Sequence, residues 1–290
     1  MENTPITKKT HKIRNTLILI LIIILFFITW AFLLSPKGLI IKEYAIHNNN
    51  LPNNFDGLKI VHFTDIHYGR TIKKKELENI VSEINKLKPD IIVFTGDLFD
   101  RNIIHSDETL NEIKSVISKL EASLKKYAIK GNHDYEQDGY ESLFENSDFI
   151  VLNNSYDILY YQGSEPIYFV GVPSMIKDTI KYDEAFQYLD ELENKENIYQ
   201  ILLLHEPDNI KNFNDYNISL ALAGHSHGGQ IRLPFIGKVI TPLGSKDYYD
   251  EYYKINNTDL YVSYGLGTSG IGVRFLNKPS INLYRLYTNT

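Results

Sequence analysis

Five short polar motifs occur in a fixed order along this chain, and each follows an apolar run that is typical of a β-strand. They are Asp65-Ile66-His67, Gly96-Asp97, Gly131-Asn132-His133-Asp134, His205 and Gly224-His225-Ser226-His227. Together they supply four imidazoles, two carboxylates and one amide as candidate metal ligands, and His133 is left over as a further imidazole. Such a set is large enough to bind two divalent metal ions side by side, an arrangement suited to attack on phosphate esters.

The spacing within these motifs suits ligands that share metal ions. Asp65 and His67 lie two residues apart where a strand gives way to a loop, and a period of two places both side chains on the same side. The carboxylate of Asp97 has two oxygens and is therefore able to bridge neighbouring cations. His227 lies two residues beyond His225, from where it can turn back to the metal held by Asp65 and His67.

The combination of motifs, and not any single one, indicates a metal centre. Asn132 adds an amide oxygen, and His205 and His225 add imidazole nitrogens. A lone histidine after a strand is usually structural, but five of the nine histidines fall at these strand ends. We interpret the other four as structural: His11, His47, His62 and His105. For His62, which lies inside the first strand, a supporting position beside the metal ligands is the alternative.

Composition limits the kind of metal and the kind of partner. The chain has 290 residues and no cysteine, so the ligands must be nitrogen and oxygen atoms, which suit Mn, Fe or Zn. The formal net charge is −6, and residues 1–36 carry +3, which leaves −9 on the remainder. Because so acidic a domain matches a nucleic-acid backbone poorly, we expect no nucleic acid among its partners.

The amino-terminal region predicts a membrane anchor. Residues 17–34 read LILILIIILFFITWAFLL, in which Thr29 is the only polar residue. At about 1.5 Å per residue this run spans most of a hydrocarbon core. A cleaved signal peptide is the alternative, but its apolar region is usually shorter and ends at a small-residue cleavage site. We therefore expect a basic tail at 1–16, a transmembrane anchor at 17–34, a lead-in at 35–57 and a catalytic domain at 58–290.

The charge around the anchor predicts its orientation. Lys8, Lys9, Lys12 and Arg14 precede the apolar run and should stay cytoplasmic. The chain would then be a single-pass protein of the cell membrane with an extracytoplasmic catalytic domain. Lys37 and Lys42 on the far side of the run weaken this bias.

The remaining pattern predicts an α/β fold in one domain. Apolar strands at 58–64, 91–95 and 127–129 alternate with helical periodicity at 73–87 and 106–123. Further strands are expected at 167–172, 200–204 and 218–223, followed by short antiparallel ones at 230–233, 238–240, 260–264 and 281–286. We expect a two-sheet β-sandwich flanked by helices, in which residues at the carboxyl ends of the strands face one crevice.

The motifs Asp65-x-His67, Gly96-Asp97-x-x-Asp100, Gly131-Asn132-His133-Asp134, His205 and Gly224-His225-x-His227 resemble the signature of calcineurin-like metallophosphoesterases. The resemblance covers most of residues 58–290. The run GHSHGGQIRLP at 224–234, with Gly265-Leu266-Gly267 and Arg274-Phe275, is similar to a membrane-anchored bacterial subgroup. That subgroup includes phosphodiesterases and UDP-2,3-diacylglucosamine pyrophosphatase-like enzymes.

The resemblance implies two divalent metal ions in one site. One ion would be held by Asp65, His67 and His227. The other would be held by Asn132, His205 and His225. The bridging ligand would be Asp97.

The resemblance also implies a catalytic pair, in which His133 is the imidazole beside the metals and Asp134 orients it. For Asp134 and Asp100 the alternative is capping of a turn or helix. A metal-bound hydroxide would attack phosphorus while His133 stabilises charge or protonates the departing oxygen.

The expected substrate is a phosphodiester or pyrophosphate, with a lipid-linked or envelope-associated compound favoured by the anchor. A protein phosphatase and a non-catalytic metal-binding scaffold are the alternatives. The segment 233–236 and Tyr248, Tyr249, Tyr252 and Tyr253 are candidates for an apolar groove that takes acyl chains, although cross-strand packing is the simpler interpretation.

Overall fold

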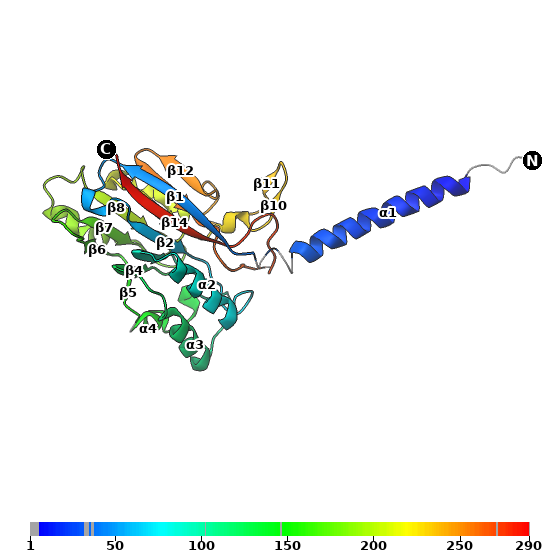
Figure 1. Cartoon of the computed structure of the whole chain (residues 1–290), viewed down its shortest axis with the longest axis horizontal. Helices are drawn as coiled ribbons and strands as arrows, with labels where there is room; N and C mark the ends of the chain where they lie inside the picture. Colours follow the sequence, from blue (N-terminus) through cyan, green and yellow to red (C-terminus); the bar gives the residue numbers. More distant parts are fainter. Residues whose placement is uncertain are drawn as a thin grey trace, which may run out of the picture.

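Two six-stranded sheets form the body of the protein in a computed structural model that describes residues 6–31, 35, 38–101, 103–145, 147–270 and 272–289 (Figure 1). The first sheet has the order β1 (Ile40–Asn48), β14 (Ser280–Thr288), β2 (Lys59–Phe63), β3 (Ile91–Phe94), β4 (Lys125–Ala128), β5 (Phe149–Val151). The second has the order β12 (Tyr252–Ile255), β13 (Thr258–Val262), β9 (Leu220–Ala223), β8 (Tyr199–Leu203), β7 (Ile167–Gly171), β6 (Ser155–Leu159).

The central strands of both sheets run parallel and are buried. β2 to β5 are mutually parallel in the first sheet, and β7, β8, β9 and β13 are mutually parallel in the second. Their near-continuous apolar sequences suit strands covered on both faces. Side chains such as Ile60, Val93, Phe169 and Leu222 pack together between the sheets as one core. The expected two-sheet sandwich is confirmed.

Helices cover the outer faces of the sandwich. α2 (Lys74–Lys86) and α3 (Asp107–Ile117) pack with α4 (Tyr140–Phe144) on the first sheet, where Ile80 and Ile113 join Phe94 in a shared core. On the second sheet lie α5 (Tyr182–Ala185) and the 3₁₀ segments Gln187–Glu191 and Pro207–Tyr216. A separate hairpin is formed by β10 (Arg232–Leu233) and β11 (Gly237–Lys238).

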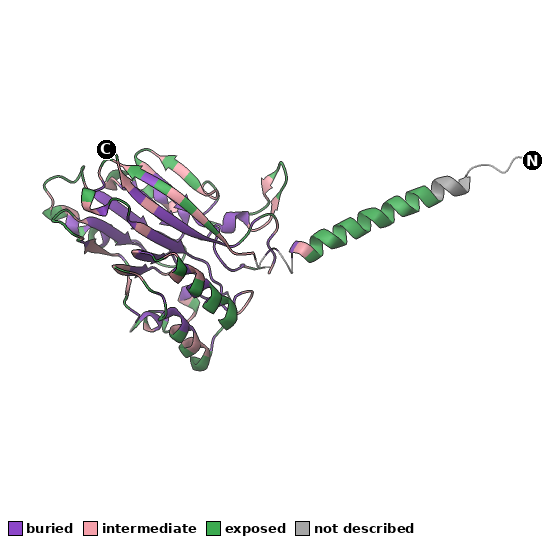
Figure 2. Cartoon of the chain, viewed as in Figure 1, coloured by how far each residue is buried: buried purple, intermediate pink, exposed green. Residues whose placement is uncertain are grey.

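Helix α1 (Ile6–Thr29) projects away from the sandwich (Figure 1). Its side chains from residue 11 to the end of the helix at Thr29 are exposed, as Figure 2 shows. Within the described residues it is the one helix that is long and apolar enough to cross a membrane, over His11–Thr29. Residues 32–34 of the expected anchor lie outside the described residues.

Two expectations about the strands differ from the structure. Part of the lead-in forms β1, which pairs along nine residues with β14 and is therefore an edge strand of the first sheet. The late strands are not uniformly antiparallel, since β13 lies parallel to β9 and β14 lies parallel to β1. Strand direction depends on partners distant in the sequence, which local periodicity does not reveal.

Candidate functional site

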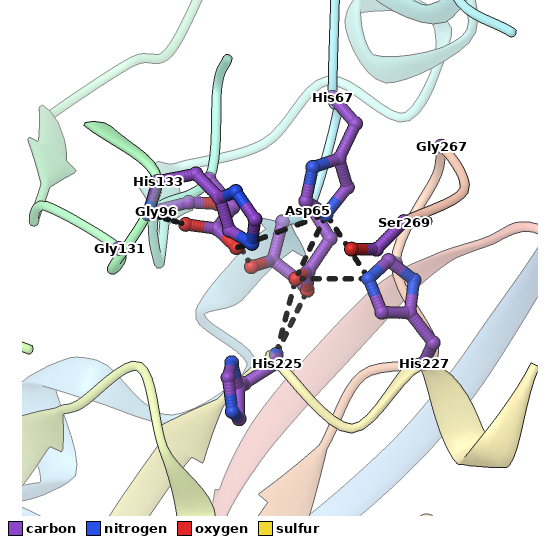
Figure 3. Close-up of polar contacts among 12 residues, drawn as sticks. Asp65, His67, Gly96, Gly131, His133, His225, His227, Gly267 and Ser269 are labelled. Carbon is purple, nitrogen blue, oxygen red and sulfur yellow. Dashed lines mark hydrogen bonds and ion pairs between the residues drawn. The ribbon is translucent and has the colours of Figure 1, made fainter. Parts of the chain in front are cut away.

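The expected metal ligands meet at the carboxyl ends of strands from both sheets. Those after β2, β3 and β4 are Asp65, His67, Asp97 and Asn132, and those after β8 and β9 are His205, His225 and His227. Figure 3 shows His67 and His227 turned towards the Asp65 carboxylate. Motifs that are far apart in the sequence thus form a single cluster in space, as expected for strands whose carboxyl ends lie at one edge.

The first group in this cluster is Asp65, His67 and His227. The Nε2 atoms of the two histidines lie 3.0 Å apart, and they lie 3.8 Å (His67) and 3.6 Å (His227) from Oδ1 of Asp65. All three side chains are buried. Ring nitrogens that face each other and a carboxylate at such distances are placed to converge on one cation.

The second group is Asp97, His205 and His225. Nε2 of His205 lies 3.2 Å from Oδ2 of Asp97 and 3.3 Å from Nδ1 of His225. The same Oδ2 atom lies 3.7 Å from Nε2 of His67, so Asp97 stands between the two groups. Asn132 adds a buried Oδ1 atom that has no hydrogen-bond partner among the described residues.

Hydrogen bonds behind the cluster fix the histidine rings. Nδ1 of His205 lies 2.7 Å from the Thr95 carbonyl, and Nε2 of His225 lies 2.7 Å from the Leu243 carbonyl. A ring N–H donated to a carbonyl leaves the other nitrogen free for a metal ion. His62 contacts the same threonine, with its Nε2 2.8 Å from the Thr95 hydroxyl. This agrees with the alternative that His62 lies behind the metal ligands and supports them.

The two buried aspartates are suited to stay ionised. Burial alone would raise the pKa of Asp65, but the neighbouring imidazoles of His227 and His67 hold it below its ordinary value. The pKa of Asp97 is likewise held low, against the effect of burial, by the imidazole of His205. Buried carboxylates among imidazoles, with an unpaired amide oxygen beside them, form a donor set that fits a pair of divalent ions.

Five of the seven expected ligands have a left-handed backbone. Positive φ angles occur at Asp65, His67, Asp97, His225 and His227, between 46° and 64°. Left-handed non-glycine residues are uncommon and cost free energy, and they concentrate at functional sites. Asp65 and His67 therefore face the same side because of this loop conformation, and not because of the strand period that the sequence suggested, since β2 ends at Phe63.

Two glycines allow close approach to the aspartates. A Cβ atom on Gly131 would lie 2.3 Å from Oδ1 of Asp97, and one on Gly224 would lie 2.6 Å from Oδ2 of Asp65. Neither distance is possible for a real side chain. The glycines next to the motifs thus make room for the carboxylates that they accompany.

The structure corrects the expected pairing of Asp134 with His133. The Asp134 carboxylate accepts the backbone N–H groups of residues 97, 98, 99 and 131, at 2.8–3.2 Å. Nδ1 of His133 has no hydrogen-bond partner among the described residues, and its Nε2 lies 3.8 Å from Oδ2 of Asp97. Asp134 therefore caps and joins the two loops that carry Asp97 and His133, in agreement with the capping alternative.

We expect Asp134→Ala to destabilise the fold by about 3 kcal/mol or more. Removing the carboxylate leaves several buried N–H groups without an acceptor, and each such group costs about 1–3 kcal/mol. Thermal unfolding of the purified full-length protein measures the loss. The exposed Asp138→Ala is the control and should stay within about 0.5 kcal/mol of the unchanged protein. Equal melting temperatures for both variants would contradict the capping role.

A cavity of about 780 Å³ opens beside the cluster. His133, Asn132 and Asp97 line it together with Arg70 and Arg101. These arginines were missed in the sequence because they lie in loops without a motif pattern. The guanidinium of Arg70 is ion-paired with Asp100, which in turn lies 3.7 Å from Nδ1 of His67. The closeness of both arginines to the motifs, three residues after His67 and four after Asp97, was the only available signal.

The candidate acyl groove is only partly supported. Tyr248 packs on Tyr253 and Tyr252 packs on Tyr261, so these aromatics serve packing within the second sheet. The segment 233–236 behaves differently, because Phe235 and Ile236 are exposed. Its continuation, which includes Val239, lines the cavity.

Comparison with known proteins gives one family. The family model described as calcineurin-like phosphoesterase matches residues 58–229. An uncharacterized metallophosphoesterase of Bacillus subtilis, YkuE, is 35% identical over 263 residues, which cover 89% of this chain and 88% of the relative.

The names of two relatives with lower sequence identity state an activity or a membrane location. The UDP-2,3-diacylglucosamine pyrophosphatase LpxG of Chlamydia trachomatis is 28% identical, with 88% of this chain and 92% of that protein covered. A transmembrane protein with a metallophosphoesterase domain from Danio rerio is 27% identical, with 83% of this chain and 56% of that protein covered.

The motifs, the sandwich and the buried ligand cluster thus agree with the family match. Members of this family are metal-dependent phosphoric ester hydrolases that use two metal ions, and one of the relatives is named as a pyrophosphatase. The chain belongs to the calcineurin-like phosphoesterase family.

Proposed function

We propose that this protein is a membrane-anchored phosphoesterase that hydrolyses a phosphodiester or pyrophosphate bond with two divalent metal ions. The observation that carries the proposal is that Asp97 joins two ligand groups beside one cavity, 3.2 Å from His205 and 3.7 Å from His67. The ions would be Mn, Fe or Zn, given the nitrogen and oxygen donors.

The residues divide into two metal sites and one group for the substrate. Asp65, His67 and His227 would hold one ion. Asn132, His205 and His225 would hold the other. Asp97 would bridge them. When bound, the ions would supply Lewis acidity and a nucleophilic hydroxide at neutral pH.

His133 is placed to act on the substrate. It lines the cavity, and burial lowers the pKa of its imidazole below the ordinary value. A ring N–H of His133 can donate a hydrogen bond to the phosphoryl group or a proton to its departing oxygen. Arg70 and Arg101 add positive charge on the same cavity, which favours a substrate with more than one anionic oxygen.

The membrane location supports a lipid-linked or envelope-associated substrate. Helix α1 supplies the candidate span, and residues 17–34 would anchor the domain as a single-pass protein. The name of the LpxG relative describes a diacylated sugar nucleotide as its substrate, which is a lipid-linked pyrophosphate. The basic residues before the span favour a domain outside the cytoplasm. Protease accessibility of the carboxyl terminus in intact cells tests this orientation, and protection from protease would contradict it.

Metal removal is the direct test of the chemistry. Full-length protein in detergent, stripped with a chelator, should lose hydrolysis of bis(p-nitrophenyl) phosphate because the nucleophile and the charge stabilisation are lost together. Adding back Mn²⁺, Fe²⁺ or Zn²⁺ singly should restore it, with about two ions per chain by elemental analysis. Hydrolysis that persists in the stripped protein would refute the proposal. Faster hydrolysis of the monoester p-nitrophenyl phosphate would move the assignment to a phosphomonoesterase.

A further inference from the structure

The hairpin of residues 231–243 presents large apolar side chains to solvent. Phe235 is fully exposed, and Ile236, Ile240 and Leu243 are each more than 70% exposed. Monomeric soluble proteins rarely expose so many large apolar side chains side by side, and such patches mark surfaces that bind another apolar surface.

The two strands of the hairpin lie outside both six-stranded sheets. β10 and β11 have two residues each and pair with each other, not with either six-stranded sheet. Among the described residues, none of the hairpin belongs to a hydrophobic core. Large apolar side chains that are exposed and join no core of the domain indicate contact with something outside the chain.

The hairpin adjoins the end of the candidate membrane span. The backbone N–H of Arg232 donates to the Phe275 carbonyl at 2.9 Å. The Phe275 ring lies 5.4 Å from the Trp30 ring and 5.9 Å from the Phe27 ring of α1. Figure 1 shows the hairpin and the carboxyl end of α1 at the same end of the domain. The apolar surface of the helix is therefore continued by Phe275 and the hairpin.

The charge of this segment favours an anionic surface. Residues 216–246 contain no aspartate or glutamate, and their cations are Lys238, Lys246 and Arg232, the last of which is ion-paired with Asp250 at 2.8 Å. This absence of acidic residues contrasts with the acidic balance of the rest of the domain. Cations that flank exposed apolar side chains are typical of segments that enter a lipid headgroup region.

We propose that the hairpin 231–243 inserts its apolar tip into the lipid surface beside α1, so that the cavity opens at the membrane interface. The inference rests on the membrane anchor of the proposed function. Ile231, Val239 and Ile240 line the same cavity as His225 and His227, so the hairpin forms the wall between the ligand cluster and the lipid. A phosphate ester carried by a lipid would thus reach the cluster without leaving the bilayer surface.

Depth-dependent fluorescence quenching tests the insertion. Trp30 is the only tryptophan, so Trp30→Phe gives a background without tryptophan that keeps an aromatic ring. Phe235→Trp in this background is the reporter, because Phe235 does not line the cavity. The full-length protein is placed in nanodiscs of phosphatidylethanolamine and phosphatidylglycerol with 5-doxyl phosphatidylcholine. We expect the doxyl label to lower the fluorescence of tryptophan at position 235 by roughly half or more. This is the result for a side chain that lies about 5–10 Å into the boundary between headgroups and acyl chains.

The control is Tyr160→Trp in the same background. Tyr160 is an exposed aromatic, 58% accessible, that directly follows β6, and β6 lies at the other end of the domain in Figure 1. Its fluorescence should not respond to the label. Equal quenching at both positions, or none at position 235, would overturn the insertion. If Phe235→Trp fails to fold, Ile236→Trp takes its place with the same expected outcome.

Hydrolysis of bis(p-nitrophenyl) phosphate separates this inference from the proposed function. Each reporter should keep turnover within about twofold of the unchanged protein, since surface substitutions away from the cavity have small effects. Active protein without quenching would overturn the hairpin insertion alone. Quenching in a protein that hydrolyses no phosphate ester would overturn the proposed function alone.

Discussion

Replacing Asp97 by alanine is expected to release the metal ions and to lower turnover by more than roughly 10²-fold. Oδ2 of Asp97 lies within 3.7 Å of a histidine from each group, so the substitution removes a ligand from both proposed sites at once. It also removes a buried negative charge that would offset the cations. Substitution of a residue that only orients a metal ligand lowers metal affinity or activity by about 10–100-fold, and loss of a shared ligand should lower them further. Elemental analysis and turnover of bis(p-nitrophenyl) phosphate measure the two effects.

The matched control for this variant is Asp138→Ala, which removes an exposed carboxylate. It should keep both metal content and turnover. If Asp97→Ala retained its full metal content after purification, Asp97 would not be a bridging ligand.

For His133→Asn, unlike Asp97→Ala, we expect both metal ions to be retained while turnover falls by roughly 10²–10⁴-fold. His133 lines the cavity and has a ring nitrogen without a hydrogen-bond partner, whereas the proposed ligands are complete without it. Asparagine retains an N–H donor but cannot transfer a proton as an imidazole does. Parallel measurement of metal content and of kcat distinguishes a catalytic group from a ligand.

His105→Asn provides a control with equal burial. His105 and His133 are each 9% exposed, but His105 packs against Tyr68 and Phe99 and does not line the cavity. Its replacement should leave turnover close to that of the unchanged protein. A His133→Asn protein that matched the unchanged protein in turnover would refute the assigned role.

Much of the site could be predicted because each ligand motif lies shortly after an apolar strand. The runs before Asp65, Asp97 and His205 are buried strands, and parallel strands bring their carboxyl ends to one edge. Residue type then identified the chemistry, because the chain without cysteine leaves only nitrogen and oxygen ligands.

The parts that could not be predicted depend on contacts between distant segments. The left-handed backbone at Asp65 and His225 follows from loops that close on each other, where Asp65 Oδ2 accepts the His225 N–H at 2.9 Å. Asp134 likewise bonds to backbone N–H groups that its sequence position does not reveal. The exposure of Phe235 was hidden for the same reason, because a strand-like apolar run gives no sign that its partner sheet is missing.

The pairing of β14 between β1 and β2 has a consequence for how the protein is made. β1 has no other partner strand within the described residues, and β14 is the element that joins it to the remainder of its sheet. While a ribosome is still translating the middle of the chain, the first sheet lacks β14. The edge of β2 that pairs with β14 is then exposed. The domain therefore completes folding only after residues 280–288 have been synthesised, a long-range closure of the slow kind.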